Sequence, residues 1–190
     1  AGLEAACTAA EVGCNTFLLE KSYELGGLAS LISKIPAKNR LADFPHYLMH
    51  RAEQLENLYI FTNTEGTPEN IRKFHPNIIV SSTGSAPLLP PIAGLKDRID
   101  NEKHNIYSIL GMINHINDFP KDLEGKKVVV VGGGAVGLDV VEFFADRNAD
   151  ISIVEMMDQI GRDLDPVSKN DTKAMMKKHL SLIHISEPTR

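Results

Sequence analysis

The chain has 190 residues, of which 43% are apolar and 24% are charged, and its formal net charge is −5. These values argue against a disordered, collagen-like or coiled-coil protein and fit one large or two small globular domains. The chain has no basic block, no apolar stretch long enough to cross a bilayer and no cysteine framework, so we expect a cytoplasmic protein that binds neither nucleic acid nor membranes.

The first twenty residues predict a helix over residues 3–12 and a short apolar strand over residues 15–19, which ends at Glu20. The same series recurs later, where Gly137 precedes a helix and a strand that ends at Glu155. In both copies 18 positions separate the glycine from the acid, counting from Gly2 in the first copy. We therefore assign Gly2 as the third glycine of a dinucleotide-binding motif, and expect the first strand and first two glycines of that unit to lie upstream of the chain.

A pair of glycines, Gly26 and Gly27, follows Glu20 and Lys21. Glycines allow a backbone to pass close to a bound cofactor, although they are also typical of an ordinary turn after a helix. The repeat favours the cofactor interpretation.

Residues 40–57 predict an amphipathic helix entered at Pro45, and residues 58–63 predict a strand. His46 and His50 stand one helical turn apart, as metal ligands often do. No acid lies between them in a metalloprotease pattern and no third ligand is near in the sequence, so we expect a surface helix face and no metal.

Residues 77–87 predict a buried strand that runs into Ser82, Thr83 and Gly84, whose small size would allow a ligand to approach. Prolines at positions 87, 90 and 91 then indicate an extended path. We interpret residues 87–125 as a connecting segment with a short helix over residues 108–117.

Residues 126–155 contain the strongest motif of the chain. Four consecutive valines predict a strand buried on both faces, glycines follow at once, and a helix over residues 135–147 leads to a second strand over residues 150–155. This is G-x-G-x-x-G in its strand–turn–helix context, with an acid at the end of the second strand for the ribose hydroxyls. The predicted dinucleotide-binding residues are Gly132, Gly134, Ala135, Val136, Gly137 and Glu155.

Residues 180–190 break the polar helical pattern that precedes them without any turn. Their sequence matches a translated adapter from sequencing libraries over all eleven positions, and we therefore exclude them from the expected fold. The alternative is a genuine short strand at the end of the chain.

Together these segments resemble a known superfamily, the two-dinucleotide flavoprotein reductases. The resemblance rests on G-L-E at 2–4, L-L-E-K at 18–21, L-G-G at 25–27, S-T-G-S-x-P at 82–87 and V-V-V-V-G-G-G-A-V-G at 128–137. Within it, the chain most resembles the C-terminal part of the 2,4-dienoyl-CoA reductase, 2-enoate reductase and NADH oxidase group, which are old-yellow-enzyme-like flavoproteins.

The resemblance implies an α/β fold of two Rossmann-like units, both incomplete here. An FAD-binding unit (1–86) would use Gly2, Glu20, Lys21, Gly26 and Gly27, with Ser82, Thr83 and Gly84 on its returning strand. The connecting segment would then lead to an NAD(P)-binding unit (126–179). Because Glu155 would repel a 2′-phosphate, NADH is favoured over NADPH, although Arg162 is close in sequence.

The resemblance also implies a flavin-dependent NADH oxidoreductase that passes electrons to FAD. An upstream part would hold an iron–sulfur cluster and an FMN barrel, which reduces the activated C=C bond of a small-molecule substrate. Disulfide reductases of this architecture carry a cysteine pair after the Gly-Gly turn or before the second glycine motif; here neither place has one, and we expect Cys7 and Cys14 to be buried and inert.

Two alternatives stay open. The chain could come from a stand-alone NADH:flavin or ferredoxin-type reductase, or from a non-enzymatic nucleotide-binding redox module. No residue is assigned as a catalytic acid, the oligomeric state is not predicted, and we expect the chain by itself to bind FAD weakly or not at all.

Overall fold

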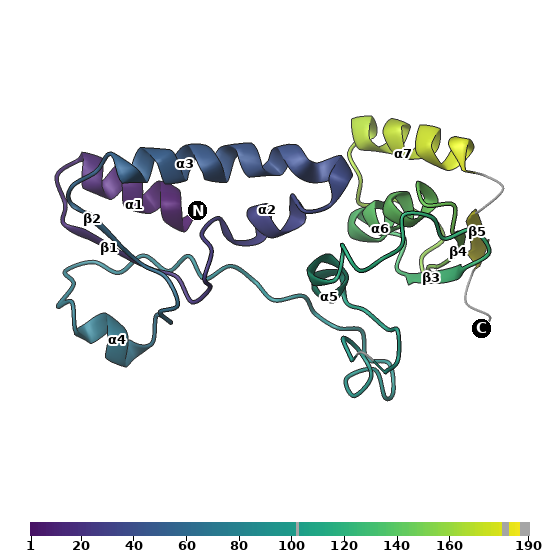
Figure 1. Cartoon of the computed structure of the whole chain (residues 1–190), viewed down its shortest axis with the longest axis horizontal. Helices are drawn as coiled ribbons and strands as arrows, with labels where there is room; N and C mark the ends of the chain where they lie inside the picture. The colour runs from purple at the N-terminus through teal and green to yellow at the C-terminus, as the bar shows by residue number, and fades with distance from the viewer. Residues whose placement is uncertain (102, 180–182, 187–190) are drawn as a thin grey trace. The chain divides into compact units, whose positions relative to one another are not determined.

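The computed structural model describes residues 1–101, 103–179 and 183–186. The chain divides into two compact units, Ala1–Lys96 and Asp97–Arg190. Each unit contains parallel strands joined through helices (Figure 1). Within the described residues, no helix is long and apolar enough to cross a membrane.

The first unit is built on two parallel strands, β1 (Thr16–Leu19) and β2 (Leu58–Phe61), with Thr16 paired to Leu58. Helix α1 (Gly2–Glu11) precedes β1, and helix α3 (Asp43–Glu53) precedes β2 and lies beside α1 (Figure 1). Three shorter elements complete the unit: α2 (Gly27–Ile32), the 3₁₀ helix η1 (Pro36–Ala42) and α4 (Pro68–Arg72).

Small apolar side chains bring α1 close to its neighbours. The buried face of α1 repeats every three to four residues, as expected of an amphipathic helix. The core of the first unit consists of Ala6, Cys7, Ala10, Ala52 and Leu58. The predicted α1 and β1 are confirmed to within a residue at each end.

Arg51 of α3 forms ion pairs with two glutamates of α1 at the edge of this core. Its guanidinium donates to Glu4 Oε1 at 2.9 Å and, through two nitrogens, to both carboxylate oxygens of Glu11 at 2.6 and 2.5 Å. This bidentate bond lowers the pKa of the Glu11 carboxyl. The Arg51 side chain is only 21% exposed, so the pairs are better shielded than ordinary surface ion pairs.

The second unit contains a parallel sheet in the order β3 (Lys127–Val131), β4 (Asp150–Val154) and β5 (Ile183–Ser186). Helix α6 (Ala135–Ala145) connects β3 to β4, and α7 (Pro166–Lys178) follows β4. Helix α5 (Ile109–Asn114) is capped by Ser108, whose side chain accepts the N–H of Gly111. These elements confirm the predicted helices near 108–117 and 135–147 and the predicted strand near 150–155.

Strand β5 lies in the tail that the sequence analysis excludes from the fold. It pairs in parallel with β4, Ile151 opposite Ile183. Residues 180–182 and 187–190 lie outside the described part, and the origin of the tail as translated adapter stays a prediction.

The sequence predictions for residues 77–87, for the valine strand and for the helix over residues 40–57 are wrong. Residues 77–87 form no strand, and Ile78 is 82% exposed, because no neighbouring strand pairs with this segment in the described structure. The valine strand is buried on one face only, since Val129 and Val131 are 63% and 64% exposed. Helix α3 is shorter than predicted: residues 40–42 belong to η1, and Pro45 stands inside the first turn of α3.

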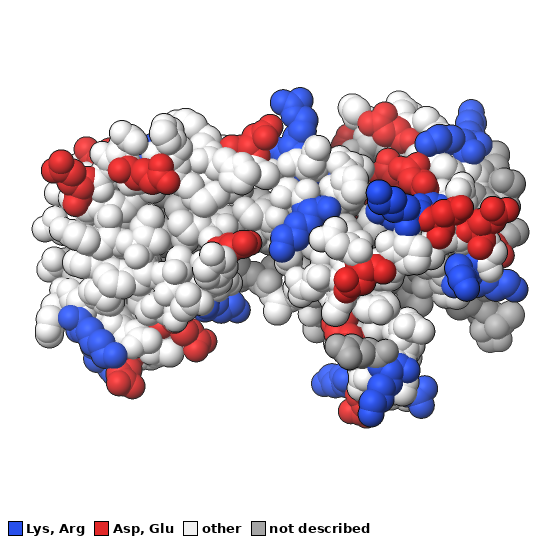
Figure 2. Space-filling view, in the orientation of Figure 1, with Lys and Arg blue, Asp and Glu red and all other residues white. Residues whose placement is uncertain are grey.

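Charged side chains are scattered over the surface. In the face drawn in Figure 2, acidic and basic side chains are interspersed and no continuous basic patch covers either unit. Cys7 is buried as expected, whereas Cys14 is exposed, because it stands in the turn between α1 and β1.

Candidate functional site

A tight glycine turn joins β3 to α6 in the second unit. Gly132 has φ +104°, which favours glycine, and Gly134 caps α6, which begins at Ala135. A Cβ atom on Gly137 would lie 1.9 Å from the carbonyl oxygen of Gly132, so only glycine lets the first turn of α6 pack this closely on the end of β3. Gly132 and Gly137 thus have the turn and packing roles that a dinucleotide-binding motif requires of its first and third glycines.

Glu155 lies directly beside this turn, at the end of β4. Its Oε2 accepts the N–H of Gly133 at 2.6 Å and its Oε1 accepts the N–H of Met157 at 2.8 Å. These backbone bonds, that of Gly133 first, lower the pKa of the Glu155 carboxyl and keep it charged at neutral pH. The structure therefore brings the predicted acid to the glycine turn, where it contacts Gly133 between the first two motif glycines.

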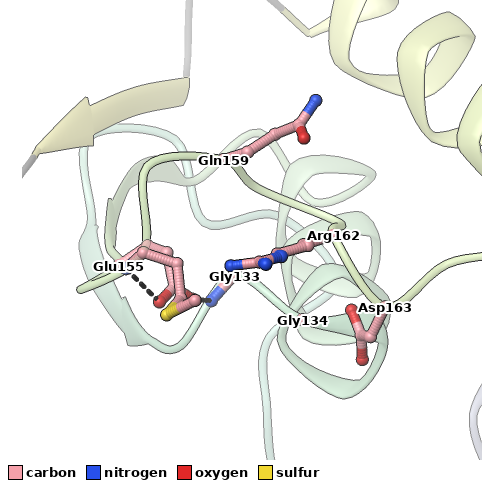
Figure 3. Close-up of a pocket in the computed structure, with 7 residues that line it drawn as sticks. Gly133, Gly134, Glu155, Gln159, Arg162 and Asp163 are labelled. Carbon is pink, nitrogen blue, oxygen red and sulfur yellow. Dashed lines mark hydrogen bonds between the residues drawn. The ribbon is translucent and has the colours of Figure 1, made fainter.

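A cavity of about 460 Å³ opens at the turn. Figure 3 shows Glu155 on one side of it and Asp163 on the other, with the Arg162 side chain between them. The lining residues are Gly133, Gly134, Glu155, Met157, Gln159, Arg162 and Asp163. Of these, Gly134 and Glu155 were predicted from the sequence as site residues.

Of the remaining lining residues, Gly133 belongs to the glycine turn and the other four come from the segment after β4. The sequence gives this segment no periodic pattern, and the one available signal was its position within eight residues of Glu155. Arg162 carries the one positive charge among the described lining residues. Ala135 contributes its backbone N–H to Asp163 at 3.3 Å, and Val136 is exposed on the first turn of α6.

In the first unit, Glu20 has the position that Glu155 has in the second. It follows β1, its backbone N–H bonds the carbonyl of Phe61 at 2.9 Å, and its Oε1 accepts the N–H of Ser22 at 2.8 Å. Lys21 beside it is exposed. Gly26 and Gly27 have φ +100° and +57° and form the start of α2, so both need a conformation that favours glycine.

Gly2 and Ser82 lie together in the same unit. A Cβ atom on Gly2 would be 3.4 Å from Ser82 Cβ and 3.7 Å from Leu18 Cδ1. The segment that carries Ser82, Thr83 and Gly84 thus passes the start of α1, although it is not the returning strand that was predicted. The structure does not test whether these residues hold FAD, which stays a prediction.

No group of three or more His, Cys, Asp and Glu side chains within the described ranges could hold a metal ion. His50 instead lies 3.5 Å from Glu53 Oε2 on the exposed side of α3.

Comparisons with known proteins agree with this geometry. The family model described as pyridine nucleotide-disulphide oxidoreductase matches residues 46–188. The NADH oxidase of Thermoanaerobacter brockii is 30% identical over 178 residues, which are 94% of this chain and 26% of that protein.

Two solved structures share the fold. A 2-naphthoyl-CoA reductase in complex with 2-naphthoyl-CoA has a TM-score of 0.76 at 24% identity, over 97% of this chain and 26% of that one. Histamine dehydrogenase from Rhizobium sp. 4-9 has a TM-score of 0.76 at 20% identity, over 98% and 29%. These likenesses confirm the predicted α/β fold with Rossmann-like units. The chain spans about a quarter of the length of the relatives it matches.

Proposed function

The chain belongs to the pyridine nucleotide-disulphide oxidoreductase family, flavoprotein oxidoreductases that use FAD and NAD(P)H, and on that premise we propose that its second unit binds NADH to reduce an FAD that the first unit helps to hold. The observation that carries the proposal is the bond between Gly133 N–H and Glu155, which holds a charged carboxylate beside the glycine turn.

Each part of the turn has a task in this proposal. The residues of the turn and the N-terminus of α6 offer backbone N–H groups and a positive dipole end to the cofactor's diphosphate. Glu155 accepts hydrogen bonds from the adenosine ribose. When bound, nicotinamide and flavin supply the hydride chemistry, and the protein supplies their binding and orientation.

Glu155 also supports NADH over NADPH. A carboxylate whose pKa is lowered stays charged at neutral pH and would repel a 2′-phosphate. Arg162 lines the same cavity and offsets part of this repulsion, so we expect a preference and not an absolute exclusion. Titration of the chain with NADH and with NADPH tests this; equal affinity for the two would contradict it.

We place the chain in a larger cytoplasmic protein, in which an FMN barrel with an iron–sulfur cluster reduces an activated C=C bond of a small molecule. Support comes from relatives that include an NADH oxidase and a CoA-ester reductase, and from the quarter of their length that the chain spans. Sequencing the DNA on both sides of this reading frame tests the proposal. A barrel and clustered cysteines upstream would support it, whereas an initiator Met directly before the first glycine motif would favour a stand-alone NADH:flavin reductase.

A further inference from the structure

The carboxylate of Asp163 lies at the N-terminus of α6. Its Oδ2 accepts the N–H of Ala135, the first residue of the helix, at 3.3 Å. A Cβ atom on Gly134 would lie 3.1 Å from Oδ2 and 3.4 Å from Oδ1 of the same carboxylate. Asp163 therefore fills the space that the missing side chain of Gly134 leaves open.

That space has a defined use in a dinucleotide-binding turn. The second glycine of the motif lets the backbone approach the diphosphate, and the first N–H groups of the helix bind it. The Asp163 carboxylate already accepts a hydrogen bond from one of those N–H groups. It also places a negative charge where the diphosphate would bring two more negative charges. Because like charges at this distance repel, the carboxylate and the diphosphate compete for the same place.

From this overlap we propose that Asp163 is an internal ligand of the NADH site, which the cofactor must displace in order to bind. The inference rests on the proposed function of the second unit. In this proposal the contact of Asp163 with α6 lowers the affinity of the site for the cofactor. It also couples cofactor binding to a movement of residues 162–163.

The surrounding segment is built so that Asp163 can leave without unfolding its neighbours. Gly161 N–H bonds the carbonyl of Gly133 at 2.8 Å, and Gly161 is buried, so this point stays anchored on the turn. Asp163 and Arg162 follow it and are exposed. Once Asp163 moves, the N–H of Ala135 loses its carboxylate acceptor and is left to bind the diphosphate.

The test compares NADH binding to four forms of the 190-residue chain: wild type, Asp163→Asn, Asp163→Ala and Asp158→Asn. Asp158 is the matched control, because it is an exposed carboxylate of the same segment that does not line the cavity. We expect Asp163→Asn to lower the Kd for NADH by about two- to fivefold, the range of a carboxylate–dipole contact at a helix N-terminus. Asp158→Asn should leave the Kd unchanged. Asp163→Ala, which also removes the acceptor, should bind at least as tightly as Asp163→Asn.

The outcomes separate the inference from the proposed function. If NADH binds all four forms with the same Kd, or binds Asp163→Asn and Asp163→Ala more weakly than wild type, Asp163 does not compete and the inference is overturned while the NADH site stands. An equal gain in both Asp163→Asn and Asp158→Asn would show a general charge effect and would also overturn it. If NADH binds none of the forms, the proposed function fails, and the inference with it.

Discussion

Oε2 of Glu155 accepts the backbone N–H of Gly133 at 2.6 Å, across 22 residues of sequence. This bond ties the end of β4 to the turn that follows β3. Two features that the sequence separates, the glycine motif and the terminal acid, therefore form one site.

Replacing Glu155 by Gln should change the choice of cofactor. The amide keeps an acceptor oxygen but loses the charge that repels a 2′-phosphate, while Arg162 remains in the cavity. We expect the ratio of the Kd values for NADPH and NADH to fall by about tenfold, near the low end of what a hydrogen bond to a charged group contributes. Parallel titrations measure it, with Glu124→Gln, an exposed acid away from the cavity, as the control. An unchanged ratio would show that Glu155 does not select the cofactor.

The Glu155 carboxyl should also make stability depend on pH. Its pKa in the folded chain is lowered from an ordinary value of 4.5 by the Gly133 bond. A lowered pKa contributes stability above the unfolded value, and this contribution is lost as the pH falls through the folded value. The free energy of unfolding of wild type should thus exceed that of Glu155→Gln most at neutral pH. This difference in free energy should shrink below about pH 4.5. Urea unfolding at several pH values measures this, and a difference that grows on acidification would contradict it.

Alanine at Gly137 should destabilise the second unit. Its Cβ would lie 1.9 Å from a backbone oxygen, which cannot move as a flexible side chain can. Overpacking of this kind costs about 1–3 kcal/mol, or a drop in Tm of roughly 4 °C or more for a unit of this size. Thermal unfolding checks it against Gly66→Ala, where a Cβ meets nothing within 4 Å and φ is not positive. Equal Tm values for the two variants would exclude the close packing.

The two cysteines should react separately and not as a redox pair. Cys14 is exposed, whereas Cys7 is buried and burial raises the pKa of its thiol. A thiol reagent should modify Cys14 fast and Cys7 only as slowly as the first unit opens. Reaction of the variants Cys14→Ser and Cys7→Ser with the same reagent assigns the fast and the slow phase of modification to the two thiols. Rapid modification of both thiols in the folded chain would contradict the burial of Cys7.

The second unit was predictable because its information is local. Gly132, Gly134 and Gly137 stand at a fixed spacing within one turn, and the apolar residues on both sides specify α6 and β4 directly. The repeat of 18 positions carried the same assignment to Gly2 and Glu20, and the structure places both at the equivalent ends of α1 and β1.

The failures share a different cause. Residues 77–87 have a strand-like sequence, but a strand needs a hydrogen-bonded neighbour, which the apolar pattern alone does not provide. The exposure of Val129 and Val131 likewise depends on what covers the sheet and not on the strand propensity of valine. Arg162 and Asp163 lie in an aperiodic segment, so only the structure brings them to the glycine turn.

Direct titration of the 190-residue chain with NADH and NADPH tests whether the glycine turn and Glu155 form an NADH site. We predict saturable binding of one NADH per chain, with NADPH bound about tenfold more weakly because of the charge on Glu155. Tighter binding of NADPH, or no saturable binding of either dinucleotide, would contradict it.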